Sequence, residues 1–146
     1  MDRSAIVFVF LLLLGAAFLR ESFAGPSQAQ LKQALKIVRN ICQPKSGATT
    51  ADIDGIRKGI FPENNEKLQE YCKCILDLLK IMKNDRFNPD AGLENLKKLP
   101  EELREPLKKG VTECRKADEG SKSGREAAYK VVKCIYNTIP QDFVFP

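Results

Sequence analysis

Residues 64–82 read NNEKLQEYCKCILDLLKIM, and this stretch decides the fold class. Asn64 or Asn65 suits a helix start, because a short polar side chain accepts hydrogen bonds from the free backbone N–H groups of a first turn. The apolar residues that follow recur at helical spacing and form one stripe: Leu68, Tyr71, Cys72, Ile75, Leu79 and Met82. The stretch therefore predicts an amphipathic helix that ends near Asn84-Asp85.

The same periodicity predicts five more helices on either side of this one. Before it we expect helices over about residues 27–42 and over a short segment capped by Thr49 and Asp52; after it we expect helices over about 89–99, 101–117 and 125–138. No segment alternates as a strand would, and residues 140–146 form a short apolar tail that cannot be helical. The sequence predicts an all-α, compact bundle of about six short helices.

Residues 1–24 have the layout of a secretory signal peptide. An apolar run extends from Ala5 to Leu19, and Ser22-Phe23-Ala24 places small residues ahead of a cut before Gly25. A retained N-terminal anchor is the alternative, although the run is shorter than the roughly 20 residues that span a bilayer. We expect a secreted, extracellular chain with a single domain over residues 25–146.

The composition excludes several classes of function. The chain has no histidine, which removes the commonest general base and the commonest metal ligand. The chain also lacks a C-x-x-C pair, which is the cysteine spacing typical of a zinc site. The formal net charge is +5, but acids interrupt the basic residues, as they do over 101–109. We therefore expect no catalysis, no cofactor, no metal, no nucleic-acid partner and no membrane insertion.

Five cysteines occur in the predicted mature chain, at 42, 72, 74, 114 and 134. An oxidising compartment favours disulfides. Because five is odd, at least one thiol is free or pairs with another chain. Cys72 falls inside the apolar stripe, whereas Cys74 lies on its flank, and a cysteine within an apolar stripe is typically a buried free thiol. We expect Cys72 to be free; an intermolecular bridge at Cys72 is the alternative.

Two segments resemble motifs of the insect odorant-binding proteins, the pheromone-binding and general odorant-binding (PBP/GOBP) family. The first is Glu70-Tyr71-Cys72-Lys73-Cys74, and the second is residues 125–134, REAAYKVVKC. The gap from Cys74 to Cys114 is also similar to that of the family. Glu70 and Arg125 stand where six-cysteine members have their second and fifth cysteines, so the chain resembles the minus-C subgroup, which lacks that bridge.

The resemblance implies two disulfides, Cys42–Cys74 and Cys114–Cys134, and an internal apolar cavity. It implies a carrier of odorants, pheromones or similar semiochemicals, with a membrane odorant receptor as a further partner and a monomer or weak dimer as the assembly. Glu70 and Arg125 occupy positions that a disulfide joins in relatives, so we hypothesise an ion pair between them; the alternative is that each faces water.

We expect the ligand site to lie between the third and sixth helices and the tail. Its candidate residues are Tyr71, Cys72, Ile75, Leu79, Tyr129, Val131, Val132, Ile135, Phe143, Val144 and Phe145. Ordinary core packing is the alternative for each helix residue, and a frayed end is the alternative for the tail. Without histidine, acid-triggered release would depend on carboxylates such as Asp142 or Glu126.

Two functions from different classes remain open. The first is a carrier that binds small apolar molecules in its cavity and transports them through extracellular fluid. The second is a secreted helical interaction protein with a filled core that acts through its surface. A dry cavity that takes up ligand distinguishes them.

Overall fold

The structure, a computed structural model, describes residues 25–146, so the predicted leader over residues 1–24 lies outside the described residues. Six α-helices make up most of the described chain: α2 (Gln28–Ser46), α3 (Thr50–Ile56), α4 (Glu66–Leu78), α5 (Pro89–Asn95), α6 (Glu101–Glu113) and α7 (Gly124–Thr138). This confirms the predicted all-α fold. Among these residues no helix combines the length and the apolarity that crossing a bilayer requires.

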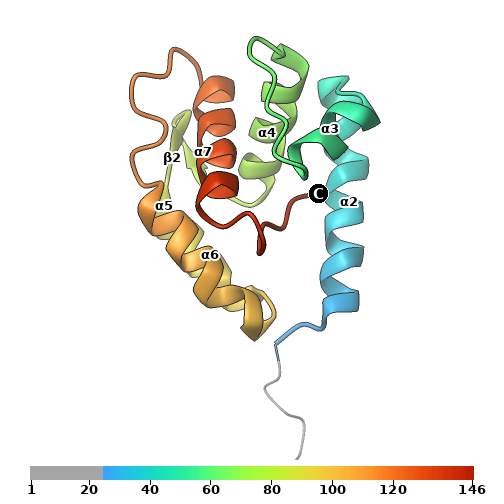
Figure 1. The fold of residues 1–146 in the computed structure, drawn as a ribbon, viewed down its shortest axis with the longest axis vertical. Coiled ribbons are helices and arrows are strands. Elements are labelled where there is room, and N and C mark those ends of the chain that lie inside the picture. The colour runs from blue at the N-terminus through green and yellow to red at the C-terminus, as the bar shows by residue number, and fades with distance from the viewer. Residues whose placement is uncertain (1–24) are drawn as a thin grey trace, which may run out of the picture.

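Helices α4 and α7 lie side by side at the centre of the molecule (Figure 1). Helix α2 packs against the other side of α4, and α6 packs against α7. Fully buried side chains from α3, α4 and α7 form the core: Ile53, Ile56, Leu68, Tyr71, Ile75 and Val131. Helix α7 is central because apolar residues spread over much of its circumference, as the sequence predicts.

Polar caps fix where three of the long helices begin. Ser27 accepts a hydrogen bond from the Gln30 N–H before α2, and Asn65 accepts one from the Leu68 N–H before α4. Ser123 does the same for α7, where it accepts from the N–H of Glu126 at 3.3 Å. These contacts confirm that local sequence sets the helix starts, since each cap satisfies a donor that the helix itself leaves free.

The helix ends differ from the predicted ones. Helix α2 continues past Pro44 to Ser46 and stops at Gly47, whose φ of 68° is left-handed. Because Pro44 lies in the last turn, the ring removes one backbone hydrogen bond without breaking the helix. Helix α6 ends at Glu113, short of the predicted 117, and a turn follows that leads to the buried Asp118.

Helix α4 stops at Leu78, well before residue 84, because Lys80 adopts a left-handed φ of 59°. The Lys80 N–H donates to the Asp77 carbonyl at 3.0 Å, and the Ile81 N–H donates to the Leu76 carbonyl at 3.0 Å. This is the Schellman arrangement, in which glycine is the usual left-handed residue. A lysine there costs roughly 1–2 kcal/mol relative to glycine.

A two-stranded hairpin follows α4 and corrects the expectation that the chain has no strand. Strands β1 (Met82–Lys83) and β2 (Arg86–Phe87) pair antiparallel, with Met82 opposite Phe87. Asn84 and Asp85 form the turn between them, with φ values of 52° and 59°. Asparagine and aspartate tolerate this left-handed conformation, which two-residue hairpin turns require. The predicted fourth helix is divided into α5 and a 3₁₀ turn, η1 (Leu96–Lys98).

Two disulfides join the helices as the family resemblance implies. Cys42–Cys74 links α2 to α4, with 5.6 Å between the Cα atoms, and Cys114–Cys134 links the end of α6 to α7, with 5.9 Å. The loops they close, of 32 and 20 residues, correspond to about 3–4 kcal/mol each by loop-closure entropy. Cys72 is a free, fully buried thiol, which confirms the prediction from the helical stripe.

Candidate functional site

A cavity of about 890 Å³ lies between the helices and the chain end. Its volume falls within the range of small-molecule sites, and side chains from every helix except α3 contribute to its wall. The wall is mainly aliphatic: Leu31, Leu35, Val38, Ile75, Leu76, Leu79, Ile81, Leu96, Leu99, Leu103, Leu107, Val111, Val132 and Ile135. Such a surface favours ligands that bury apolar area rather than ligands that need many hydrogen bonds.

Helix α2 supplies one side of this cavity through Leu31, Leu35 and Val38. Their spacing of three to four residues puts them on a single face of the helix. None of the three is fully buried, because this face borders open space rather than a packed neighbour. Leu103, Leu107 and Val111, from α6, also line the cavity.

The chain end folds back between α7 and α2 (Figure 1), and Phe143, Val144, Phe145 and Pro146 line the cavity. The Phe145 ring meets the Tyr71 ring edge-on, with 6.1 Å between the centroids. Two hydrogen bonds hold the tail: the Arg57 Nε donates to the Phe145 carbonyl at 3.0 Å, and the Tyr71 hydroxyl donates to the main-chain oxygen of Pro146 at 3.0 Å.

The eleven candidate ligand residues from the sequence divide into two groups. Seven of them line the cavity: Ile75, Leu79, Val132, Ile135, Phe143, Val144 and Phe145. The other four are not among its lining residues. Tyr71, Cys72 and Val131 are fully buried in the core. Tyr129 packs edge-on against Phe61 at 5.7 Å and donates its hydroxyl proton to the Pro62 carbonyl at 2.8 Å.

The walls that α2 and α6 supply were not predicted as part of the site. The sequence shows their signal, since Leu31, Leu35, Val38, Leu107 and Val111 recur at helical spacing. That signal indicates which face of a helix is apolar. It does not indicate whether the face meets another helix or a void, which depends on how distant segments pack.

The buried groups beside the cavity stay neutral at physiological pH. Burial raises the pKa of Tyr71 to about 12, although the positive charges of Arg39 and Arg57 act in the opposite direction. Burial also raises the pKa of the Cys72 thiol, so the reactive thiolate is suppressed. Neither Tyr71 nor Cys72 therefore titrates near pH 7.

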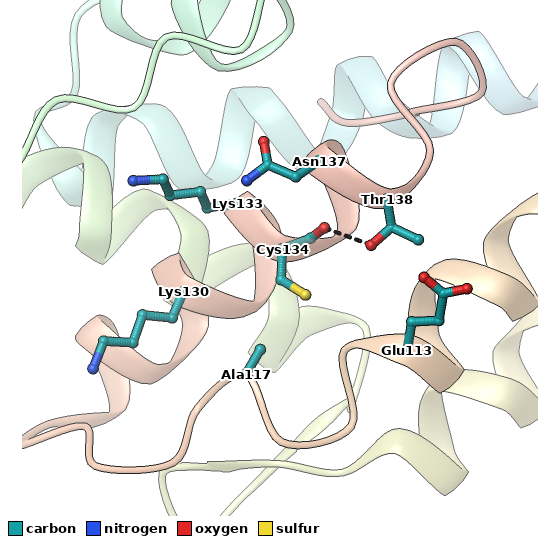
Figure 2. A pocket seen from close by; sticks show the side chains of 7 residues that line it. All are labelled: Glu113, Ala117, Lys130, Lys133, Cys134, Asn137 and Thr138. Carbon is teal, nitrogen blue, oxygen red and sulfur yellow. Dashed lines mark hydrogen bonds between the residues drawn. The ribbon is translucent and has the colours of Figure 1, made fainter.

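A second, shallow depression lies on the outer surface over α6 and α7, and Figure 2 shows its lining. Glu113, Lys130 and Lys133 border it, and Cys134 lies at its centre. The Thr138 hydroxyl donates to the Cys134 carbonyl at 3.0 Å and lies 3.6 Å from the Cys114 sulfur. Its open, charged lining lacks the apolar enclosure of the first cavity, so we do not assign it as the ligand site.

Arg125 makes an ion pair with α4, but not with the residue hypothesised from the sequence. Its Nη2 lies 3.1 Å from Oε1 of Glu66, whereas Glu70 is exposed one helical turn further along. The arginine side chain is long enough to reach the earlier turn. The hypothesised pair with Glu70 is therefore wrong, and the partner of Arg125 is Glu66.

Comparison with known proteins gives one family. The sequence model of the PBP/GOBP family matches residues 24–138. General odorant-binding protein 72 of Anopheles gambiae is 28% identical over 121 residues, which cover 82% of this chain and 98% of that protein. The crystal structure of odorant binding protein 4 of Chrysopa pallens has a TM-score of 0.76 at 34% identity and covers 83% of this chain and 99% of its own. Apis mellifera odorant binding protein 5 also gives 0.76, at 32% identity over 84% of this chain and 99% of its own.

Proposed function

This chain belongs to the PBP/GOBP family of odorant-binding proteins, and from that premise we propose that it carries odorants, pheromones or similar semiochemicals through an aqueous extracellular fluid. Members of the family are non-enzymatic carriers of small hydrophobic ligands, so the chain is a carrier and not an enzyme. Its two disulfides are consistent with the minus-C subgroup. The identity of the ligand class is the part that we propose.

The observation that supports this proposal is the aliphatic cavity of about 890 Å³. An apolar void of this size is unfavourable when empty, because its wall lacks packing partners. A ligand that fills it gains about 25 cal/mol for each Å² of apolar surface removed from water. A protein that acts only through its surface has no need of such a void, so the cavity favours the carrier over the interaction protein.

We assign ligand contact to the candidates that line the cavity: Ile75, Leu79, Val132, Ile135, Phe143, Val144 and Phe145. Tyr71, Cys72, Tyr129 and Val131 act behind this wall, where they fix the helices and the tail. The tail over 140–146 is proposed as a movable part of the wall, because it lines the cavity and lies outside the helices.

We propose further that residues 1–24 are a signal peptide and that residues 25–146 form a single secreted domain. The disulfides of the family are consistent with secretion. Expression of the full sequence in insect cells tests this: mass spectrometry of the medium is expected to find a chain that begins at Gly25. Retention of the uncut chain in the membrane fraction would support the anchor instead.

We propose a monomer or weak dimer that delivers its ligand to a membrane odorant receptor.

Binding is tested by displacement of an apolarity-sensitive fluorescent probe with long-chain alcohols, esters and terpenoids. A second experiment determines where the ligand binds. It introduces a single tryptophan, because the chain has none of its own. Ala34 and Ala29 are both exposed on α2, but only Ala34 lines the cavity. In Ala34→Trp, ligand is expected to shift tryptophan emission to shorter wavelength; in the matched control Ala29→Trp it is expected to have no effect.

Saturable, competable binding together with a shift in Ala34→Trp alone supports the proposed function. A folded, correctly bridged protein that takes up none of these ligands would contradict it and favour the surface-acting alternative. If ligand binds but the emission of neither tryptophan variant shifts, the ligand binds outside this cavity.

A further inference from the structure

The charged side chains that line the cavity within residues 25–146 are both lysines. Lys80 and Lys98 line it, and no carboxylate side chain does so within residues 25–146. Both lysines are exposed, and neither forms an ion pair among the described residues. In contrast, the neighbouring Lys97 is paired with Glu94 at 2.8 Å. The two lysines at the mouth are thus free to meet an anion from outside the protein.

One asparagine joins the two segments that carry these lysines. The Asn95 Nδ2 donates to the Leu79 carbonyl at 2.5 Å, and the Lys98 Nζ donates to the Asn95 Oδ1 at 2.9 Å. Lys80 directly follows Leu79, so this short chain of contacts joins the end of α4 to η1. The rim between them is apolar, because Leu78 and Leu79 are 41% and 44% exposed.

The backbone at Lys80 is a second, independent observation. Its left-handed φ of 59° at the end of α4 is a conformation that favours glycine, so a lysine there carries a conformational cost. A residue held in such a conformation beside a binding site points to a role for its side chain. Lysine at this position places an ammonium group at the cavity, which glycine could not do.

We propose that the cavity prefers amphiphilic ligands with a long apolar chain that ends in a carboxylate. The chain occupies the aliphatic interior, and the carboxylate stays at the mouth, where Lys80 and Lys98 donate charge-assisted hydrogen bonds to it. A carboxylate remains partly hydrated at such a rim, so it avoids the cost of entering the apolar interior. This inference rests on the proposed carrier function and adds the chemical class of the ligand.

The experiment compares dodecanoic acid, 1-dodecanol and methyl dodecanoate at pH 7.4, each below its aggregation concentration, by displacement of the same probe from the purified, oxidised protein. The acid is expected to bind about tenfold more tightly than the methyl ester. Lys80→Met and Lys98→Met are each expected to weaken acid binding about threefold, and the double variant about tenfold, in line with partly exposed charge pairs. Binding of the alcohol is expected to stay unchanged in all three variants.

Lys97→Met is the matched control, because Lys97 is adjacent to Lys98 and does not line the cavity. This variant is expected to bind all three ligands as the unchanged protein does. Salt gives a further readout: since charges at a rim are screened, 0.5 M NaCl is expected to reduce the preference for the acid.

The outcomes separate this inference from the carrier function. If the alcohol binds but the acid has no advantage, or if the double variant keeps that advantage, the carboxylate site is overturned and the carrier function stands. If neither the acid nor the alcohol binds to the folded protein, the carrier function fails and this inference fails with it.

Discussion

The hydroxyl of Tyr71 donates a hydrogen bond to the main-chain oxygen of Pro146, with 3.0 Å between the two oxygen atoms. Tyr71 is fully buried on α4, and Pro146 lies 75 positions later in the chain. A buried hydroxyl needs a partner, and here the chain end supplies it. This contact joins the apolar tail to the centre of the bundle and sets one wall of the cavity.

Tyr71→Phe is therefore expected to loosen the tail while leaving its packing intact. The ring contact with Phe145 remains, and only the hydrogen bond is lost, which costs about 1 kcal/mol of unfolding free energy. If the tail opens for ligand exchange, the same change speeds probe dissociation about fivefold. Denaturant unfolding and stopped-flow release measure the two effects.

Tyr136→Phe is the control for that variant. Tyr136 also packs against the tail, with its ring 5.2 Å from that of Phe143, but no hydrogen bond of its hydroxyl occurs within residues 25–146. Both quantities are expected to stay at their original values. Unchanged release in Tyr71→Phe, despite a loss of stability, would mean that ligands leave by another route.

The Cys72 thiol is expected to resist modification in the folded protein. It is fully buried, and burial raises its pKa, so both access and thiolate are lacking. A chromogenic disulfide reagent at pH 8 is expected to titrate no thiol in buffer and one thiol per chain in 6 M guanidinium. Fast reaction in buffer, or a disulfide-linked dimer on a non-reducing gel, would contradict the assignment of Cys72 as a free core residue.

The ion pair between Arg125 and Glu66 is expected to contribute little. The two side chains are 40% and 70% exposed, so solvent screens them, and a double-mutant cycle with Arg125→Met and Glu66→Gln should give a coupling energy below about 1 kcal/mol. Circular dichroism melts of the four proteins provide the measurement.

A disulfide at the same place is expected to contribute more. The double substitution Glu70→Cys with Arg125→Cys should oxidise spontaneously and raise stability by about 3 kcal/mol, because it closes a long loop. Glu66→Cys with Arg125→Cys tests the neighbouring turn. Failure of the first pair to oxidise would show that positions 70 and 125 do not approach each other closely enough for a bridge.

Acid is expected to weaken the start of α7 through Glu126. Hydrogen bonds from the Lys130 ammonium and then from the Lys122 N–H lower the pKa of its carboxyl. A lowered folded-state pKa contributes stability that is present above the unfolded pKa, about 4.3, and is lost as the pH falls through the folded value. Glu126→Gln should therefore lose less stability than the unchanged protein between pH 6 and pH 3.

Lys130→Met should reproduce part of that effect, because it removes the first cause of the lowered pKa. Neither Glu126 nor Asp142 lines the cavity. Acid is thus expected to lower stability over this range without displacing an uncharged ligand directly. Release of the alcohol at a pH where the fold is still intact would require a different titrating group.

Much of the fold follows from one-dimensional patterns. The stripe from Leu68 to Ile75 places Cys72 toward the core and Cys74 toward the flank, and the structure has Cys72 free and Cys74 bonded to Cys42. Helix starts also follow, because a cap such as Asn65 or Ser123 acts within one turn. These features depend only on residues that are close in sequence, so helical spacing is sufficient to predict them.

Only the tertiary structure decided where space remains between the helices. Leu35 on α2 and Leu103 on α6 line one cavity, although 68 positions separate them in the sequence. Their periodicity marks each as apolar, but whether such a face meets a neighbour or a void depends on how far apart two helices are held. The position of the tail and the partner of Arg125 have the same origin, since each is set by contacts between segments that the chain brings together only when it folds.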